Sequence, residues 1–144
     1  MMLDLTVSQS IEINAEPEKV WDALTNPEII KEYLFGTETI TDWNVGSEII
    51  FQGEYDGHSY ADKGIIMDNI LYELLSYSYW SGFSGLEDKP ENYSLVTYTL
   101  ENNESNKSTI FTWTQKGYAT KEGYNHSVDG MEEFLKQIKG IVER

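Results

Sequence analysis

The sequence predicts an α+β fold in which a mostly antiparallel sheet packs against a long C-terminal helix. Three observations support this fold. A long alternating strand opens the chain and leads into two short helices, a series of paired strands follows, and an amphipathic helix closes the chain. The links between successive strands are too short for parallel crossovers, so we expect antiparallel pairing.

The first strand is expected over residues 3–13. Its odd positions are apolar except for Gln9, and its even positions are polar. A period of two is typical of a strand with one buried and one solvated face. This strand is therefore expected to place its odd-numbered side chains in the core.

Two short helices are expected directly after this strand. Pro17 and Pro27 each suit a first helical position, where the missing N–H would have had no partner. Asn26 precedes the second proline and is a favoured N-cap residue. Gly36 is suited to end the second helix, because glycine readily adopts a positive φ.

The middle of the chain has the pattern of consecutive antiparallel strands. The Asp56-Gly57 pair is a strong signal for a hairpin turn. The longest polar loop, residues 81–92, is a candidate gate or dimer contact. Strands are expected over residues 37–40, 48–55, 59–67, 74–80, 93–100 and 109–115.

The last part of the chain is expected to form one amphipathic helix. At about 100° per residue, its apolar side chains fall on one stripe. Tyr124 and Ser127 continue the stripe backwards, with Gly123 and Gly130 along its edge. This end of the helix either packs tightly on the sheet or covers a cavity. The stripe contains Val128, Met131, Phe134, Leu135, Ile138, Ile141 and Val142.

Composition favours one acidic domain that spans residues 1–144. Ten basic and 25 acidic residues give a net charge of −15. Phosphate backbones and anionic membranes would be repelled, so we expect no nucleic-acid partner and no membrane insertion. The chain has no cysteine and no apolar run or leader pattern of the kind that membrane spans and secretory signals require, and we expect a cytoplasmic protein.

Metal, cofactor and nucleophile motifs are not apparent. His58 and His126 fall in different elements, and no cysteine is available to complete a zinc site, so neither metal nor cofactor is expected. The sequence contains no Gly-x-Ser-x-Gly elbow for a nucleophilic serine. Glu54 and Asp68 are the carboxylates considered for acid–base chemistry, and both are expected to face solvent. Catalytic residues remain unknown.

One stretch of sequence resembles a known family. Residues 11–28 read Ile-x-Ile-x-Ala-x-Pro-Glu-x-Val-Trp-x-Ala-Leu-Thr-x-Pro-Glu. This pattern is similar to the opening of START-like (SRPBCC) domains, and most similar to the branch named for the activator of the heat-shock chaperone ATPase. Later segments agree in order over almost the whole chain. The resemblance implies a helix-grip fold, with a curved antiparallel sheet around the C-terminal helix.

A strongly curved sheet and one helix leave a cleft that ordinary side chains do not fill, and concave apolar clefts bind small molecules. Tyrosines on the inner face add hydroxyl groups that need partners. Taken singly, each aromatic residue also fits a filled core. The expected ligand cavity comprises Phe51, Tyr55, Tyr77, Tyr79, Tyr98, Phe111, Trp113, Tyr124, Ser127, Met131 and Phe134.

Three functions are compatible with the sequence. The first is binding of a small apolar or aromatic molecule in the cavity. The second, implied by the family's name, is a chaperone-associated protein of the stress response. The third is a cyclase or hydrolase that uses the same cavity. The protein is expected to be a monomer or a homodimer.

Overall fold

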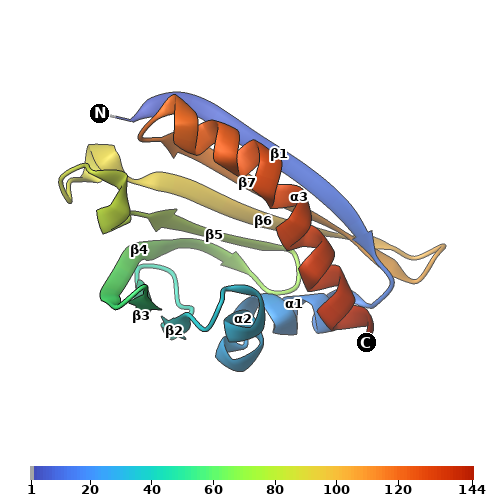
Figure 1. Ribbon diagram of the computed structural model, residues 1–144. Helices are drawn as coiled ribbons and strands as arrows, with labels where there is room; N and C mark the ends of the chain where they lie inside the picture. The colour runs from blue at the N-terminus through green and yellow to red at the C-terminus, as the bar shows by residue number, and fades with distance from the viewer. Residues whose placement is uncertain (1) are drawn as a thin grey trace.

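Seven strands form one antiparallel sheet, and a long helix lies across one face of it (Figure 1). The computed structural model describes residues 2–144, except for the side chain of Tyr55. The elements in chain order are β1 (Leu3–Ile13), α1 (Pro17–Thr25), α2 (Pro27–Tyr33), β2 (Glu38–Ile40), β3 (Glu48–Tyr55), β4 (His58–Ile70), β5 (Leu74–Tyr79), the short 3₁₀ helices η1 (Gly82–Ser84) and η2 (Pro90–Asn92), β6 (Ser94–Asn103), β7 (Ser108–Tyr118) and α3 (Lys121–Glu143).

The strand order is β1-β7-β6-β5-β4-β3-β2. The first strand therefore pairs with the last one, while the remaining strands follow one another as a meander. Helix α3 runs over the sheet, and its C-terminal end lies beside α1 and α2 (Figure 1). The predicted helix-grip fold is confirmed. None of the helices within residues 2–144 combines the length and apolar character that a membrane crossing requires.

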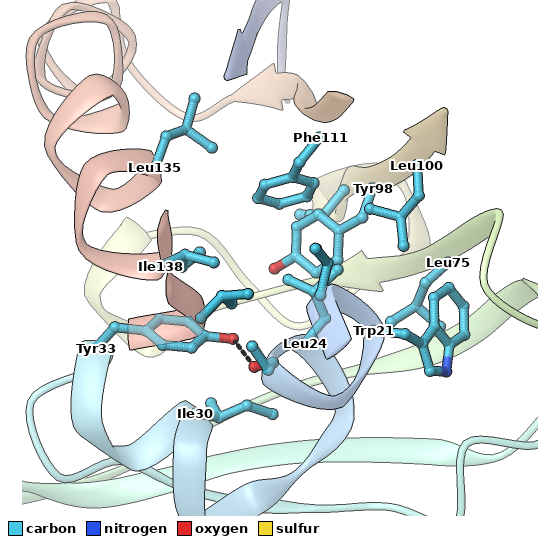
Figure 2. Close-up of a cluster of buried hydrophobic side chains, with 14 of the residues drawn as sticks. Trp21, Leu24, Ile30, Tyr33, Leu75, Tyr98, Leu100, Phe111, Leu135 and Ile138 are labelled. Atoms are coloured by element: carbon cyan, nitrogen blue, oxygen red, sulfur yellow. Dashed lines mark hydrogen bonds between the residues drawn. The ribbon is translucent and has the colours of Figure 1, made fainter. Parts of the chain in front are cut away.

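The two short helices begin at their prolines, as predicted. The side chain of Asn26 accepts a hydrogen bond from the Glu28 backbone N–H at 3.0 Å, which caps α2. Helix α1 buries Trp21 against the core. The Tyr33 hydroxyl donates to the Ala23 carbonyl oxygen at 2.9 Å and so ties α2 to α1 (Figure 2). These contacts close one end of the sheet.

The second half of α3 packs on the main core. Leu135 and Ile138 are almost completely buried and lie over Phe111 of β7 (Figure 2). The first half of α3 instead contacts a smaller cluster of Val7, Tyr118 and Met131. The helix is therefore anchored at two separate places on the sheet.

Several local features differ from the sequence prediction. Strands β6 and β7 extend three residues beyond their predicted ends, to Asn103 and Tyr118. Strand β4 continues to Ile70 instead of ending at residue 67, because an irregularity between Ile66 and Asp68 allows pairing with β5 to continue. Val128, predicted to lie on the buried stripe of α3, is 39% exposed. It belongs to the half of α3 that rests on the smaller cluster, where Met131 makes the buried contact.

A candidate ligand-binding cavity

A cavity of about 400 Å³ lies between the sheet and α3. Such a volume is typical of small-molecule sites. Strands β3 to β7 form its walls, the segment after α2 and helix η1 contribute to its rim, and α3 contributes one side chain. The lining residues are Leu34, Phe35, Thr37, Phe51, Glu54, Tyr60, Asp62, Tyr77, Tyr79, Phe83, Val96, Tyr98, Trp113, Gln115 and Phe134.

Strand register brings the central side chains together. Tyr98 of β6 lies opposite Trp113 of β7, and Val96 lies opposite Gln115. On the other side, Val96 lies opposite Tyr77 of β5. Because directly opposed residues of antiparallel strands share one face of the sheet, these side chains form a continuous surface toward α3.

The structure places six of the predicted cavity residues on this lining: Phe51, Tyr77, Tyr79, Tyr98, Trp113 and Phe134. Their rings contact one another, with the centroids of Tyr98 and Trp113 at 5.1 Å and those of Trp113 and Phe134 at 5.7 Å. Tyr55 was predicted to join them, but its side chain lies outside the described part of the structure.

The other four predicted residues lie outside the cavity. Phe111 is completely buried in the main core. Met131 belongs to the smaller cluster, and Tyr124 packs on the Tyr118 ring at 5.6 Å. Ser127 is half-buried one turn before Met131. Of the two alternatives for this end of α3, tight packing on the sheet agrees with the structure, because the smaller cluster fills the space beneath the helix. The expected cavity positions of Tyr124, Ser127 and Met131 are therefore corrected.

Sequence analysis did not place the polar lining residues Thr37, Glu54, Tyr60, Asp62 and Gln115 in the cavity. Among them, Asp62 of β4 is a buried acid. Its side chain is buried, with 8% of the residue exposed. The Tyr79 hydroxyl donates to Asp62 Oδ2 at 2.6 Å, whereas Asp62 Oδ1 has no partner among the described residues. Strand alternation was the available signal, since Asp62 is two residues from Gly64 and four from Ile66, which are both buried. Glu54 is exposed at the rim.

A pair of tyrosine hydroxyls lies deeper in the cavity. The oxygens of Tyr77 and Tyr98 are 2.9 Å apart, so one hydroxyl donates to the other. Burial raises the pKa of Tyr77 to about 12 and holds the pKa of Tyr98 well above its usual range. Burial, together with the nearby Asp62 carboxylate, also raises the pKa of Tyr79. These hydroxyls are therefore neutral hydrogen-bonding groups at neutral pH.

The buried tyrosines predict a loss of stability at alkaline pH. In an unfolded chain, tyrosine ionises near its ordinary pKa of about 10. Because the folded-state pKa of Tyr77 is raised to about 12 and that of Tyr98 is held well above its usual range, the unfolded state releases protons first. The stabilisation is complete below about pH 10 and is lost as the pH rises through the folded-state values. Urea unfolding as a function of pH measures this loss.

The Tyr77→Phe variant provides the control for that experiment. It removes one of the ionising hydroxyls, so its unfolding midpoint should fall less steeply above about pH 10 than that of the unaltered protein. Identical slopes for the two proteins would show that ionisation of Tyr77 does not contribute to alkaline unfolding.

Two exposed aromatic side chains flank the rim of the cavity. Phe35 is 82% exposed and Phe83 is 68% exposed. Phe35 packs edge-on against Phe134, and Phe83 contacts Tyr60. Phe35 also has a φ of +54°, a conformation that is uncommon for a bulky residue. The rim is therefore apolar and open to solvent.

Metal ligands do not gather at this site. Within residues 2–144, no group of three or more His, Cys, Asp or Glu side chains has the arrangement that would hold a metal ion. The chemistry of the cavity comes instead from aromatic rings, tyrosine hydroxyls and the Asp62 carboxylate.

A curved antiparallel sheet that grips a C-terminal helix defines a START-like (SRPBCC) protein. The chain belongs to the family described as activator of Hsp90 ATPase homolog 1-like protein, whose sequence model matches residues 14–143. The predicted family is confirmed. No match was found among curated proteins.

Solved structures agree with this assignment. A protein from Cytophaga hutchinsonii, known from its solution structure, is 41% identical, with a TM-score of 0.84, and the match covers 99% of this chain and 97% of that one. A Mesorhizobium loti protein is 23% identical, with a TM-score of 0.77 and coverage of 97% and 98%. The Aha1 dimer from Colwellia psychrerythraea is 19% identical, with a TM-score of 0.74 and coverage of 96% for each chain. At 23% and 19% identity, the Mesorhizobium and Colwellia structures support the fold and nothing further.

Proposed function

We propose that the protein binds a small apolar or aromatic molecule in the cavity between the sheet and α3. The observation that carries this proposal is a cavity of about 400 Å³ whose surface is mainly aromatic and aliphatic. Burial of apolar ligand area there would contribute about 25 cal/mol per Å². The exposed rings of Phe35 and Phe83 support an apolar entrance.

The Gln115→Trp variant tests the proposal by filling the cavity. Gln115 is partly exposed and lines the site from β7, so an indole at this position would occupy the ligand volume without entering the main core. We expect methylnaphthalene to bind the unaltered protein. Its affinity should fall by about 10-fold or more in the variant, because the indole would take the place of the probe and reduce the apolar area that the probe can bury. Equilibrium dialysis measures both affinities.

Lys116→Trp is the matched control. Lys116 is the next residue of β7, is exposed, and points to the other face of the strand. This variant adds the same indole but should leave probe affinity unchanged. Equal loss in both variants, or no binding to the unaltered protein, would contradict a site between the sheet and α3.

A chaperone-associated function is the second candidate, and the family's description favours it. The Colwellia relative of the same fold is an Aha1 dimer, so a dimer of this chain is part of the same candidate. A pull-down with the heat-shock chaperone at low salt tests the partner, and analytical ultracentrifugation tests the dimer. Absence of chaperone binding would remove this candidate. A cytoplasmic location is part of the same proposal.

An enzyme is the third candidate, and the buried Asp62 beside Tyr79 favours it. A carboxylate and a hydroxyl in contact are groups that a cyclase or hydrolase would use for proton transfer. Mass spectrometry of candidate ligands after incubation with the protein tests this candidate. Ligands recovered unchanged would support binding without turnover.

A further inference from the structure

The Asp62 carboxylate is a polar group that the fold leaves incompletely satisfied. The residue is only 8% exposed, and the Tyr79 hydroxyl occupies Oδ2 at 2.6 Å. Oδ1 has no hydrogen-bond partner among the described residues, although a carboxylate offers about four acceptor positions. Buried carboxylates are normally paired or well hydrogen-bonded, because removing their charge from water is costly. The site therefore has unused acceptor capacity.

The electrostatic character of the cavity favours a cation. Its lining contains two acidic residues, Asp62 and Glu54, and none of the lining residues is a lysine or an arginine. Lys63 follows Asp62 in the chain but forms an ion pair with Asp88. The whole chain also carries a net charge of −15. An anionic ligand would enter against this field, whereas a cationic one would be attracted by it.

We propose that the ligand of this cavity combines an aromatic or apolar body with a positively charged amine that donates to the Asp62 carboxylate. This inference rests on the proposed function and narrows its ligand class. The rings of Phe51, Tyr77 and Trp113 would bury the apolar body. The Tyr79 hydroxyl donates to one oxygen of Asp62 and so limits the orientation of this carboxylate, which would accept a hydrogen bond from the amine. Fatty acids and other carboxylates are disfavoured ligands.

Three probes of the same shape separate this inference from simple apolar binding. They are naphthylmethylamine, neutral methylnaphthalene and anionic naphthoate. In the unaltered protein the amine should bind about 10-fold or more tightly than naphthoate, as expected for a charge-assisted hydrogen bond. In Asp62→Asn the affinity for the amine should fall by about 10- to 100-fold, while that for methylnaphthalene should change by less than about 3-fold.

Two further variants keep the test specific. Asp68→Asn removes one negative charge from an exposed position on the same strand, and all three affinities should stay unchanged. Tyr79→Phe retains the carboxylate and frees its second oxygen, so the preference for the amine should persist. This second variant tests the inference even where Asp62→Asn does not fold, which circular dichroism would reveal.

The outcomes distinguish this inference from the proposed function. Equal affinity for amine and naphthoate, unchanged amine affinity in Asp62→Asn, or loss of the preference in Tyr79→Phe would each overturn the amine proposal. If methylnaphthalene still binds in those cases, the proposed function stands. If none of the three probes binds the unaltered protein, both proposals fail.

Discussion

Replacing Gly64 with alanine should destabilise the protein more than other single methyl additions. A Cβ at Gly64 of β4 would overlap the carbonyl oxygen of Ser78 in β5 and lie 2.5 Å from its carbonyl carbon. These are backbone atoms, and the neighbouring residues hold the strands together through mutual Lys63 and Trp80 hydrogen bonds of 3.0 and 2.8 Å. The two strands would have to separate, at an expected cost of about 3 kcal/mol or more.

Gly140→Ala is the matched control for this substitution. Gly140 lies inside α3, and a Cβ there would meet no heavy atom within 4 Å. Alanine is the better helix former, so this variant should gain about 0.5–1 kcal/mol. Urea unfolding measures both changes in the free energy of unfolding. A cost below about 1 kcal/mol for Gly64→Ala would contradict the close approach of β4 and β5.

Phe111→Ala should cost about 3–5 kcal/mol of unfolding free energy, the range for truncating a large buried aromatic residue. Phe111 is completely buried, lies opposite Ile11 in β1 and Leu100 in β6, and contacts the Tyr98 ring at 5.6 Å. Its removal would leave a cavity inside the main core. Urea unfolding of the variant measures the loss.

Phe83→Ala is the control, because it deletes the same side chain from a position that is 68% exposed. Its free energy of unfolding should stay within about 0.5 kcal/mol of that of the unaltered protein. A mild effect of Phe111→Ala together with weaker probe binding would contradict its place in the core. That result would restore Phe111 to the ligand site, where sequence reasoning had placed it.

The sequence predicted those elements of the fold whose structure depends on a few neighbouring residues. Alternation over residues 3–13 and the prolines at Pro17 and Pro27 determine structure within a few neighbouring residues, and the structure confirms all three elements. The Asp56-Gly57 turn is another such case, since both residues adopt the positive φ that the hairpin requires.

The cavity was predictable only in part, because its position depends on the spacing between α3 and the sheet. Alternation indicated which face of each strand is buried, and Tyr77, Tyr98 and Trp113 do line the cavity. It could not show that Met131 and Tyr118 would fill the space under the first half of α3. That outcome depends on side chains from elements far apart in the sequence.

Asp62 was missed for a related reason. It lies in a polar segment close to the hairpin turn, where aspartate is usually solvated. Its burial depends on its neighbours in space, including Phe51 opposite it in β3 and Tyr79 from β5. Neither contact is encoded in the residues adjacent to Asp62, although the period of two in β4 assigns it to the inner face.

Methyl NMR during titration with methylnaphthalene tests the central claim most directly. Val96 lines the cavity, whereas Ile13 and Val142 belong to the core outside it. Saturable shifts at the Val96 methyl groups and the Trp113 indole, with little change at Ile13 and Val142, are the predicted result. Shifts confined to exposed side chains, or no shift at Val96 at any probe concentration, would contradict a ligand site between the sheet and α3.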